Sequence, residues 1–202
     1  MSWELPHLLH DYLLSASAHV ENINVEDGEQ GGSYGPMIRF VSWARPSSRV
    51  GAPLLLELEQ RWGSVGYSRL AATASFTLGK AHGVQVAPLI DVRIVSHDAP
   101  IDVQPALGDA HAVPGLRWGE LRGHARLVAE TAASVPIGSG FLRLRVASGA
   151  IGGDPNDWGS ARWTSGAQLA LLWSTQIGDL EAGYGLATRG DGRFDVSIGR
   201  RF

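Results

Sequence analysis

The carboxyl-terminal residues of the chain alternate between apolar and polar side chains. Phe194, Val196, Ile198 and Phe202 share one parity, and polar residues or glycine fall between them. Successive side chains of a β-strand point to opposite faces, so this alternation predicts a strand with one apolar and one polar face. Strands of membrane barrels have this pattern, because lipid covers their outer side and water their inner side.

The same alternation recurs through most of the chain, for example over 142–146, 168–173 and 180–186. About ten segments have the length of a barrel strand. We therefore predict an all-β fold, an antiparallel transmembrane β-barrel with about ten strands in this chain. These strands form either a small barrel or part of a larger, truncated one. Residues 1–10 are expected to be an N-terminal segment, and 11–202 the outer-membrane barrel domain.

Turn residues divide these segments. The expected strands are approximately 12–20, 38–45, 54–61, 70–78, 84–94 and 125–129, with four more between 140 and 202. The expected short turns are 63–66, 134–140 and 178–179, and the expected long loops are 24–36, 97–120 and 149–166. Outer-membrane barrels have short periplasmic turns and longer outer loops, so we assign the two sets to opposite ends of the barrel.

The composition excludes several classes of protein. Charged residues are 18% of the chain, below the roughly 25% of soluble domains. The net charge of -3 gives no basis for nucleic-acid binding, which needs a basic surface. The chain has no cysteine, which excludes disulfides and thiolate metal sites. No apolar run reaches about 18 residues, so only a closed barrel could span a bilayer.

The amino terminus does not have the features of a secretory signal peptide. Its apolar stretch, residues 8–14, is interrupted by His10 and Asp11, and Glu4 precedes it where a basic region would be expected. Residues 16–18 resemble a cleavage site only superficially. We therefore expect Met1 to begin a mature, truncated or recloned segment.

Charges of both signs recur in the middle of the expected strands, on the polar parity. In a small soluble barrel or sandwich that face would have to fill a core. The charges therefore favour a membrane barrel with a hydrated lumen, in which they pair with one another. The residues of this predicted lumen network are Glu57, Glu59, Arg61, Asp91, Arg93, Arg126, Glu130, Arg143, Arg145 and Glu181.

Short motifs near the carboxyl terminus resemble a known family. They are Thr-Gln-Ile-Gly-Asp-Leu at 175–180, Gly-Tyr-Gly at 183–185, Gly-Arg-Phe at 192–194 and Ser-Ile-Gly-Arg-Arg-Phe at 197–202. They resemble the end of the bacterial surface-antigen barrels, the BamA and TamA relatives, and more closely the carboxyl-terminal barrel of bacterial patatin-like phospholipases. Arg201 replaces the usual proline. The resemblance implies a barrel of about sixteen strands.

The end of the chain is also expected to direct assembly. The apolar row of the last strand could be read by strand addition at an open sheet edge. The barrel-assembly machinery is therefore an expected partner. The residues of this predicted assembly signal are Phe194, Val196, Ile198 and Phe202.

A second match is Pro-Gly-Leu-Arg-Trp-Gly-Glu-Leu-Arg-Gly at 114–123. It is similar to the segment of patatin-linked barrels that forms the inward-folding sixth extracellular loop. The resemblance implies that this loop enters the lumen, where Arg117 or Arg122 pairs with Glu57, Glu59, Asp91 or Glu130. Pro114 stands where the wider superfamily has the arginine of its loop tip, so that arginine's salt bridge is not expected here. The predicted motif residues are Pro114, Gly115, Leu116, Arg117, Leu121, Arg122 and Gly123.

No catalytic or metal-binding pattern is found in the sequence. The patatin Gly-x-Ser-x-Gly elbow is absent, and Ser139 lacks its spacing. The histidines are scattered without ligand spacing. The acidic residues near 98–111 indicate a solvated loop, and those at 152–157 a turn. We expect no enzymatic activity, no cofactor and no metal.

The sequence thus predicts a bacterial outer-membrane barrel that acts as a translocator, anchor or pore. The expected partners are outer-membrane lipid, the assembly machinery and a passenger or lipase domain, and not nucleic acid. Two alternatives remain. One is a small outer-membrane lipid-modifying barrel enzyme, which would need a catalytic cluster at one rim. The other is a soluble lipocalin-like ligand-binding barrel, which also alternates with period two.

Overall fold

The computed structural model describes residues 2–3, 12–24, 30–42, 50–51, 53–81, 83–108, 112–154, 156–175 and 178–199. These residues form one antiparallel sheet of thirteen strands, ten of which have seven or more residues. The predicted all-β antiparallel fold is confirmed. The strands are β1 (Ser2–Trp3), β2 (Tyr12–Asn24), β3 (Gln30–Ser42), β4 (Val50–Gly51), β5 (Leu54–Gly63), β6 (Tyr67–Ser75), β7 (Thr77–Ala81), β8 (Val84–Val95), β9 (Ala125–Ile137), β10 (Gly140–Gly152), β11 (Arg162–Thr175), β12 (Gly178–Ala187) and β13 (Arg193–Gly199).

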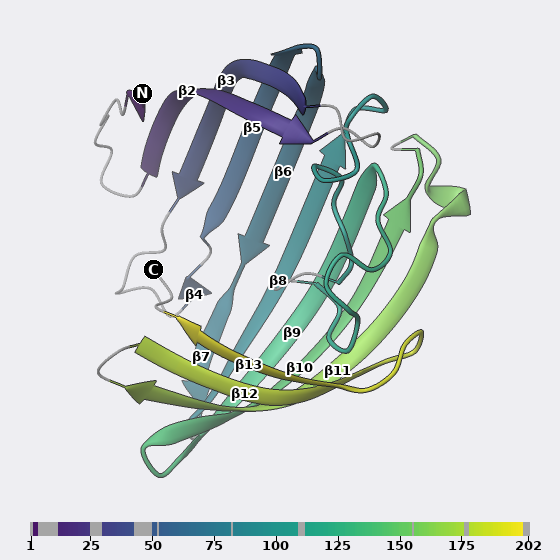
Figure 1. Ribbon diagram of the computed structural model, residues 1–202. Helices are drawn as coiled ribbons and strands as arrows, with labels where there is room; N and C mark the ends of the chain where they lie inside the picture. The colour runs from purple at the N-terminus through teal and green to yellow at the C-terminus, as the bar shows by residue number, and fades with distance from the viewer. Residues whose placement is uncertain are drawn as a thin grey trace.

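The sheet is a meander in which the long strands pair in chain order. β1 lies at one edge and β13 at the other, and the described hydrogen bonds do not join these edges. Figure 1 shows a strongly curved sheet, with the connection between β8 and β9 inside its curve. We call this connection, residues 96–124, the inner loop. The face of the sheet on which it packs is the inner face, and the opposite face is the outer face.

Several predicted boundaries are wrong. β3 begins at Gln30, so most of the expected loop 24–36 is strand. Glycines in this segment indicated a turn, but Gly35 serves a close backbone approach, because a Cβ there would overlap the carbonyl group of Gln60. Packing against the neighbouring strand overrides the local turn preference.

The hairpin connections are also shorter than predicted. β9 continues to Ile137 and β10 begins at Gly140, which leaves two residues for the expected turn 134–140. The connection after β10 covers 153–161, and it includes a 3-10 turn at Trp158–Ser160. The expected turn 178–179 lies inside β12, and residues 176–177 lie outside the described residues.

The connection 64–66 lies at the same end of the sheet as the long loops. The Ser96 amide, where the inner loop begins, donates to the Ser68 carbonyl at 2.9 Å. Consecutive antiparallel strands alternate in direction, so every second connection falls at the same end. The prediction that 63–66 lies at the opposite end from the inner loop is therefore wrong.

The outer face carries large apolar side chains that nothing in the described structure covers. No described helix is long and apolar enough to cross a membrane. The exposed apolar surface is formed by strand residues. Its exposed large residues are Tyr34, Ile38, Leu54, Leu58, Trp62, Ile90, Val135, Ile137, Leu144, Val146, Trp163, Leu169, Leu171, Tyr184, Leu186, Phe194, Val196 and Ile198.

Candidate functional site

The inner face carries a network of ion pairs that includes all ten residues of the predicted lumen network. Between β3 and β5, Arg39 pairs with its cross-strand partner Glu57 at 2.6 Å. The carboxylate of Glu59 lies between Arg61, at 2.6 Å, and Arg69, at 3.0 Å. Glu59 and Arg69 are cross-strand neighbours, so the register itself brings these charges together.

Asp91 is the centre of the next group. Arg126 pairs with it from the neighbouring strand, and its Nε donates to Oδ2 of Asp91 at 3.1 Å. Thr73 donates to the other carboxylate oxygen at 2.8 Å, and Arg93 Nε lies 3.4 Å from Asp91. Arg93 and Arg126 are cross-strand partners. The single carboxylate therefore lies between two arginines and reduces the repulsion between them, but it balances only one of their two charges.

The remaining predicted charges pair across β9 to β12. Arg145 donates to Glu130 at 2.6 Å and to Gln168 at 3.1 Å. Arg143 reaches over Ala170, its partner on β11, to Glu181 at 3.3 Å. Gln168 is the direct cross-strand partner of Arg145, whereas the contact with Glu130 is diagonal and the one between Arg143 and Glu181 skips one strand, spans that the long arginine side chain can cover.

Sequence reasoning missed several members of the network. Arg39 and Arg69 complete the groups around Glu57 and Glu59, and Arg193 pairs with Asp195 at 2.6 Å on β13. All four additional residues have the polar parity of their strands. Extending the parity rule to every charged residue would have found them.

The inner loop covers this face through an apolar cluster. Leu107, Val113 and Leu116 of the loop are buried against Val128 on β9 and against Ala147 and Ile151 on β10. The Arg126 guanidinium also donates to the Ala106 carbonyl at 2.6 Å. The loop is therefore fixed to the strands by both apolar packing and a hydrogen bond from a buried cation.

Glycines on three neighbouring strands make room for the inner loop, Gly149 for its side chains and Gly166 and Gly185 for its backbone. A Cβ at Gly149 would lie 2.7 Å from Leu107 Cδ2. A Cβ at Gly166 would overlap the Pro114 carbonyl, and one at Gly185 would lie 2.8 Å from the Gly115 amide nitrogen. We call Gly149, Gly166 and Gly185 the glycine seat.

The predicted motif 114–123 forms the tip of the inner loop. Pro114, Gly115 and Leu116 are buried, and Leu121 packs on the apolar cluster with a φ of 55°. A positive φ is uncommon for a residue with a side chain and marks a backbone that its surroundings hold in place. The side chain of Glu120 accepts the Arg117 amide at 2.7 Å and closes the turn.

The two motif arginines do not have the predicted partners. Arg117 is exposed and lies 4.0 Å from Asp191. Arg122 donates to the carbonyls of Ile101 and Gln104, at 2.9 and 3.3 Å. The cation that links loop and inner carboxylates is Arg126, on the strand that follows the motif.

Two histidines lie at the ends of the inner loop. The rings of His97 and His124 stack with centroids 4.9 Å apart. Gln104 Nε2 lies 3.4 Å from His124 Nε2, and His124 Nδ1 lies 2.9 Å from the Gly153 carbonyl. These contacts hold the two ends of the inner loop together, beside the connection 153–161.

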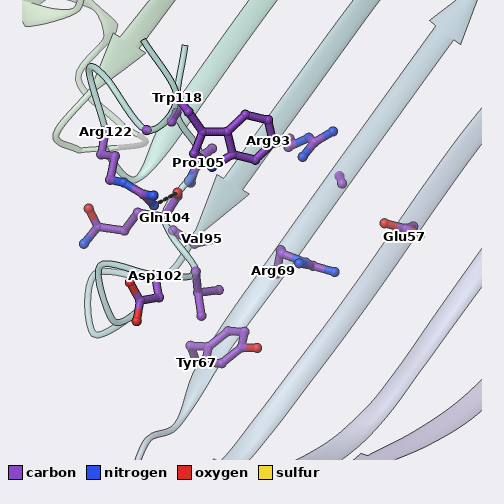
Figure 2. Close-up of a pocket in the computed structure, with 14 residues that line it drawn as sticks. Glu57, Tyr67, Arg69, Arg93, Val95, Asp102, Gln104, Pro105, Trp118 and Arg122 are labelled. Carbon is purple, nitrogen blue, oxygen red and sulfur yellow. Dashed lines mark hydrogen bonds between the residues drawn. The ribbon is translucent and has the colours of Figure 1, made fainter. Parts of the chain in front are cut away.

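A cavity of about 390 Å³ remains between the loop and β5, β6 and β8. Figure 2 shows Glu57, Arg69 and Arg93 on the strand side of this cavity, with Trp118 and Arg122 on the loop side. It is the most strongly charged hollow that we find in the described part of the inner face.

The residues of the predicted assembly signal are only partly described. Phe194, Val196 and Ile198 lie on the outer face of β13 and are exposed. Phe202 lies outside the described residues. Ser139 lies in the hairpin between β9 and β10, and among the described residues no group of three or more His, Asp or Glu is placed to hold a metal.

No protein-family model matches this chain, and a comparison with curated proteins finds no match.

Proposed function

We propose that the chain forms the wall of a bacterial outer-membrane β-barrel that acts as an anchor or translocator, with the inner loop plugging its lumen. The chain carries no catalytic domain in this proposal. One observation carries the argument: the exposed large apolar residues of the strands lie almost entirely on the outer face, and the paired charges lie on the inner face.

The outer face exposes more large apolar side chains than the surface of a soluble monomer usually does. Monomeric soluble proteins rarely expose contiguous apolar patches above a few hundred Å². Here exposed apolar side chains run from β3 to β13. Lipid would cover all of them at once, and Trp62 and Trp163, near strand ends, would lie at the interface where tryptophan is favoured.

The inner face suits an aqueous, partly filled lumen. Its charges are paired, which lowers the cost of placing them under a loop. A soluble ligand-binding barrel would instead need this face to be an apolar core. The inner loop, held by the apolar cluster and the glycine seat, supplies the plug.

A membrane barrel also requires that the two open edges of the sheet become paired. Unpaired strand edges do not occur in the hydrocarbon region, because their backbone groups would lack hydrogen bonds. The proposal therefore includes closure of the barrel, either between β1 and β13 or through further strands. The family resemblance favours further strands.

The test uses tryptophan fluorescence in lipid. We would fold the chain into phosphatidylcholine vesicles whose acyl chains are brominated near the headgroup, using variants that retain only Trp163 or only Trp118. Bromine should strongly quench Trp163 on the outer face and hardly affect Trp118 on the inner loop. A chain that is monomeric and soluble without detergent, or equal quenching of both tryptophans, would contradict the proposal.

A further inference from the structure

We propose that the cavity between the inner loop and β5, β6 and β8 binds an oxyanion of the phosphate class. Three arginines line it, Arg69 and Arg93 from neighbouring strands and Arg122 from the loop (Figure 2). Trp118 lines the loop side and is 70% exposed. The cavity volume, about 390 Å³, is in the range of small-molecule sites.

Among the ion pairs of the described residues, arginines outnumber carboxylates behind this cavity. The ion-pair groups around Glu57, Glu59 and Asp91 contain five arginines against these three carboxylates. In contrast, Glu130, Glu181 and Asp195 are matched by three arginines at the other side of the inner face. The loop adds one charge of each sign, Arg122 and Asp102, to the cavity lining. An anion bound in the cavity would lie beside this arginine-rich group.

Arg69 is ion-paired with Glu59, but its buried Nε makes no hydrogen bond within the described residues. Its Nε lies 3.0 Å from Glu59 Oε2 but without hydrogen-bond geometry, and within the described residues neither atom has another hydrogen-bond partner. The side chains of Arg69 and Arg93 are 32% and 36% exposed. Guanidinium groups bind phosphate and carboxylate through parallel hydrogen bonds, so two partly exposed ones beside a hollow suit an oxyanion.

The loop makes this site more selective than an open surface patch. It covers one side of the cavity, which excludes part of the solvent and strengthens charge interactions inside. The Trp118 indole could pack on the organic part of a phosphorylated ligand and donate from its ring nitrogen. The cavity consists only of strand and loop residues, so the inference does not depend on whether lipid covers the outer face.

The experiment is calorimetric titration of the full chain in a non-ionic detergent. The probes are inorganic phosphate and, in a second arm, dioctanoyl phosphatidic acid. Arg69→Gln and Arg93→Gln should each weaken phosphate affinity by about tenfold or more, since each removes charge-assisted hydrogen bonds. The control Arg193→Gln removes an inner-face arginine outside the cavity and should change the affinity by less than about twofold.

Both probes can support the site and identify its natural ligand. Tighter binding of phosphatidic acid than of phosphate indicates a lipid headgroup, whereas equal affinity indicates a free phosphate group. Absence of binding by either probe, or an equal loss in Arg193→Gln, overturns the proposal. Phosphate should also change the tryptophan fluorescence, and Trp118→Phe should remove that change. This readout does not require the arginine variants to fold, and a fluorescence change that persists in Trp118→Phe also overturns the proposed site.

Discussion

Asp91 on β8 and Arg126 on β9 form a buried ion pair that also fixes the inner loop. The two side chains are 1% and 0% exposed. The Arg126 guanidinium binds the Asp91 carboxylate and donates to the Ala106 carbonyl of the loop at 2.6 Å. One cation therefore joins two strands and the segment that covers them.

Replacing Arg126 by Met should strongly destabilise the protein. It leaves the Asp91 carboxylate with a single weaker cation and the Ala106 carbonyl without its donor. Breaking a buried pair costs about 3–5 kcal/mol, whereas an exposed pair is worth at most about 1 kcal/mol. Urea unfolding in micelles should show this difference between Arg126→Met and the half-exposed control Arg193→Met. Similar losses of unfolding free energy in both variants would mean that the buried pair contributes no more than an exposed pair.

Leu144→Arg should destabilise the membrane-inserted state, by roughly 2–4 kcal/mol if the position is near the bilayer midplane. Phe141→Arg, on the same strand but the opposite parity, should cost clearly less. The two side chains are similarly exposed, at 49% and 46%. Folding titrations into liposomes measure the difference, and equal costs would refute the assignment of the faces.

Ala170 is not a suitable inner-face control, although its parity alone would make an arginine there better tolerated than one at Leu171. Ala170 is buried beneath the Arg143 side chain, and Gly183 lies directly beside it. The inner face is filled at this position. We therefore expect Ala170→Arg to be as damaging as Leu171→Arg on the outer face.

Arg122→Ala should loosen the inner loop, whereas Arg117→Ala should leave it unchanged. Arg122 donates to two loop carbonyls, while the exposed side chain of Arg117 makes, among the described residues, only a long contact with Asp191. We expect the Arg122 variant to show faster chymotrypsin cleavage at Trp118 and a higher single-channel conductance in planar bilayers. The same result for both variants would assign the ordering of the loop to its apolar cluster alone.

Gly185→Ala should displace the tip of the loop. The added methyl group would lie 2.8 Å from the Gly115 amide nitrogen, and backbone cannot move aside as a flexible side chain can. Gly153→Ala, where a Cβ meets nothing within 4 Å, is the matched control. Protease susceptibility of the loop should rise only in the Gly185 variant. If the loop resists protease in both variants as well as in the wild type, the glycine seat is not required to hold it.

Ile198→Asp should impair assembly into the outer membrane of cells more than Ser197→Asp. Ile198 belongs to the exposed apolar row of β13, and its neighbour Ser197 has the other parity. Deletion of Phe202 is expected to act in the same direction. Surface levels are the measurement. Normal levels of the Ile198 variant would count against the last strand as an assembly signal.

Parity along each strand was sufficient to predict the two faces of the sheet. Leu144 and Val146 are exposed, and Arg143 and Arg145 pair on the inner face, as the alternation indicates. This succeeded because the period of a strand is two and depends on no distant contact. Boundaries were harder to predict, because glycines such as Gly35 indicate a turn in sequence but serve close backbone approach in the sheet.

Partners across the fold could not be predicted from parity. The pairing of Asp91 with Arg126 depends on register, and the donation to Ala106 depends on how the loop folds back. The resemblance indicated a loop that enters the curve of the sheet, but it assigned the contact to Arg117 or Arg122. The chain uses a strand arginine instead, which no local pattern distinguishes from its neighbours.

The glycine seat has a consequence for the order in which the protein acquires its structure. Residues 113–116 rest on β10, β11 and β12, all of which follow the loop in the chain. Arg193, which donates to the Leu116 carbonyl at 3.4 Å, is 77 positions further on. Such distant contacts form late, since the intervening chain must first be ordered. A chain in which β12 has not yet joined the sheet therefore lacks the strand against which Gly115 packs, and full seating of this tip follows the addition of β12.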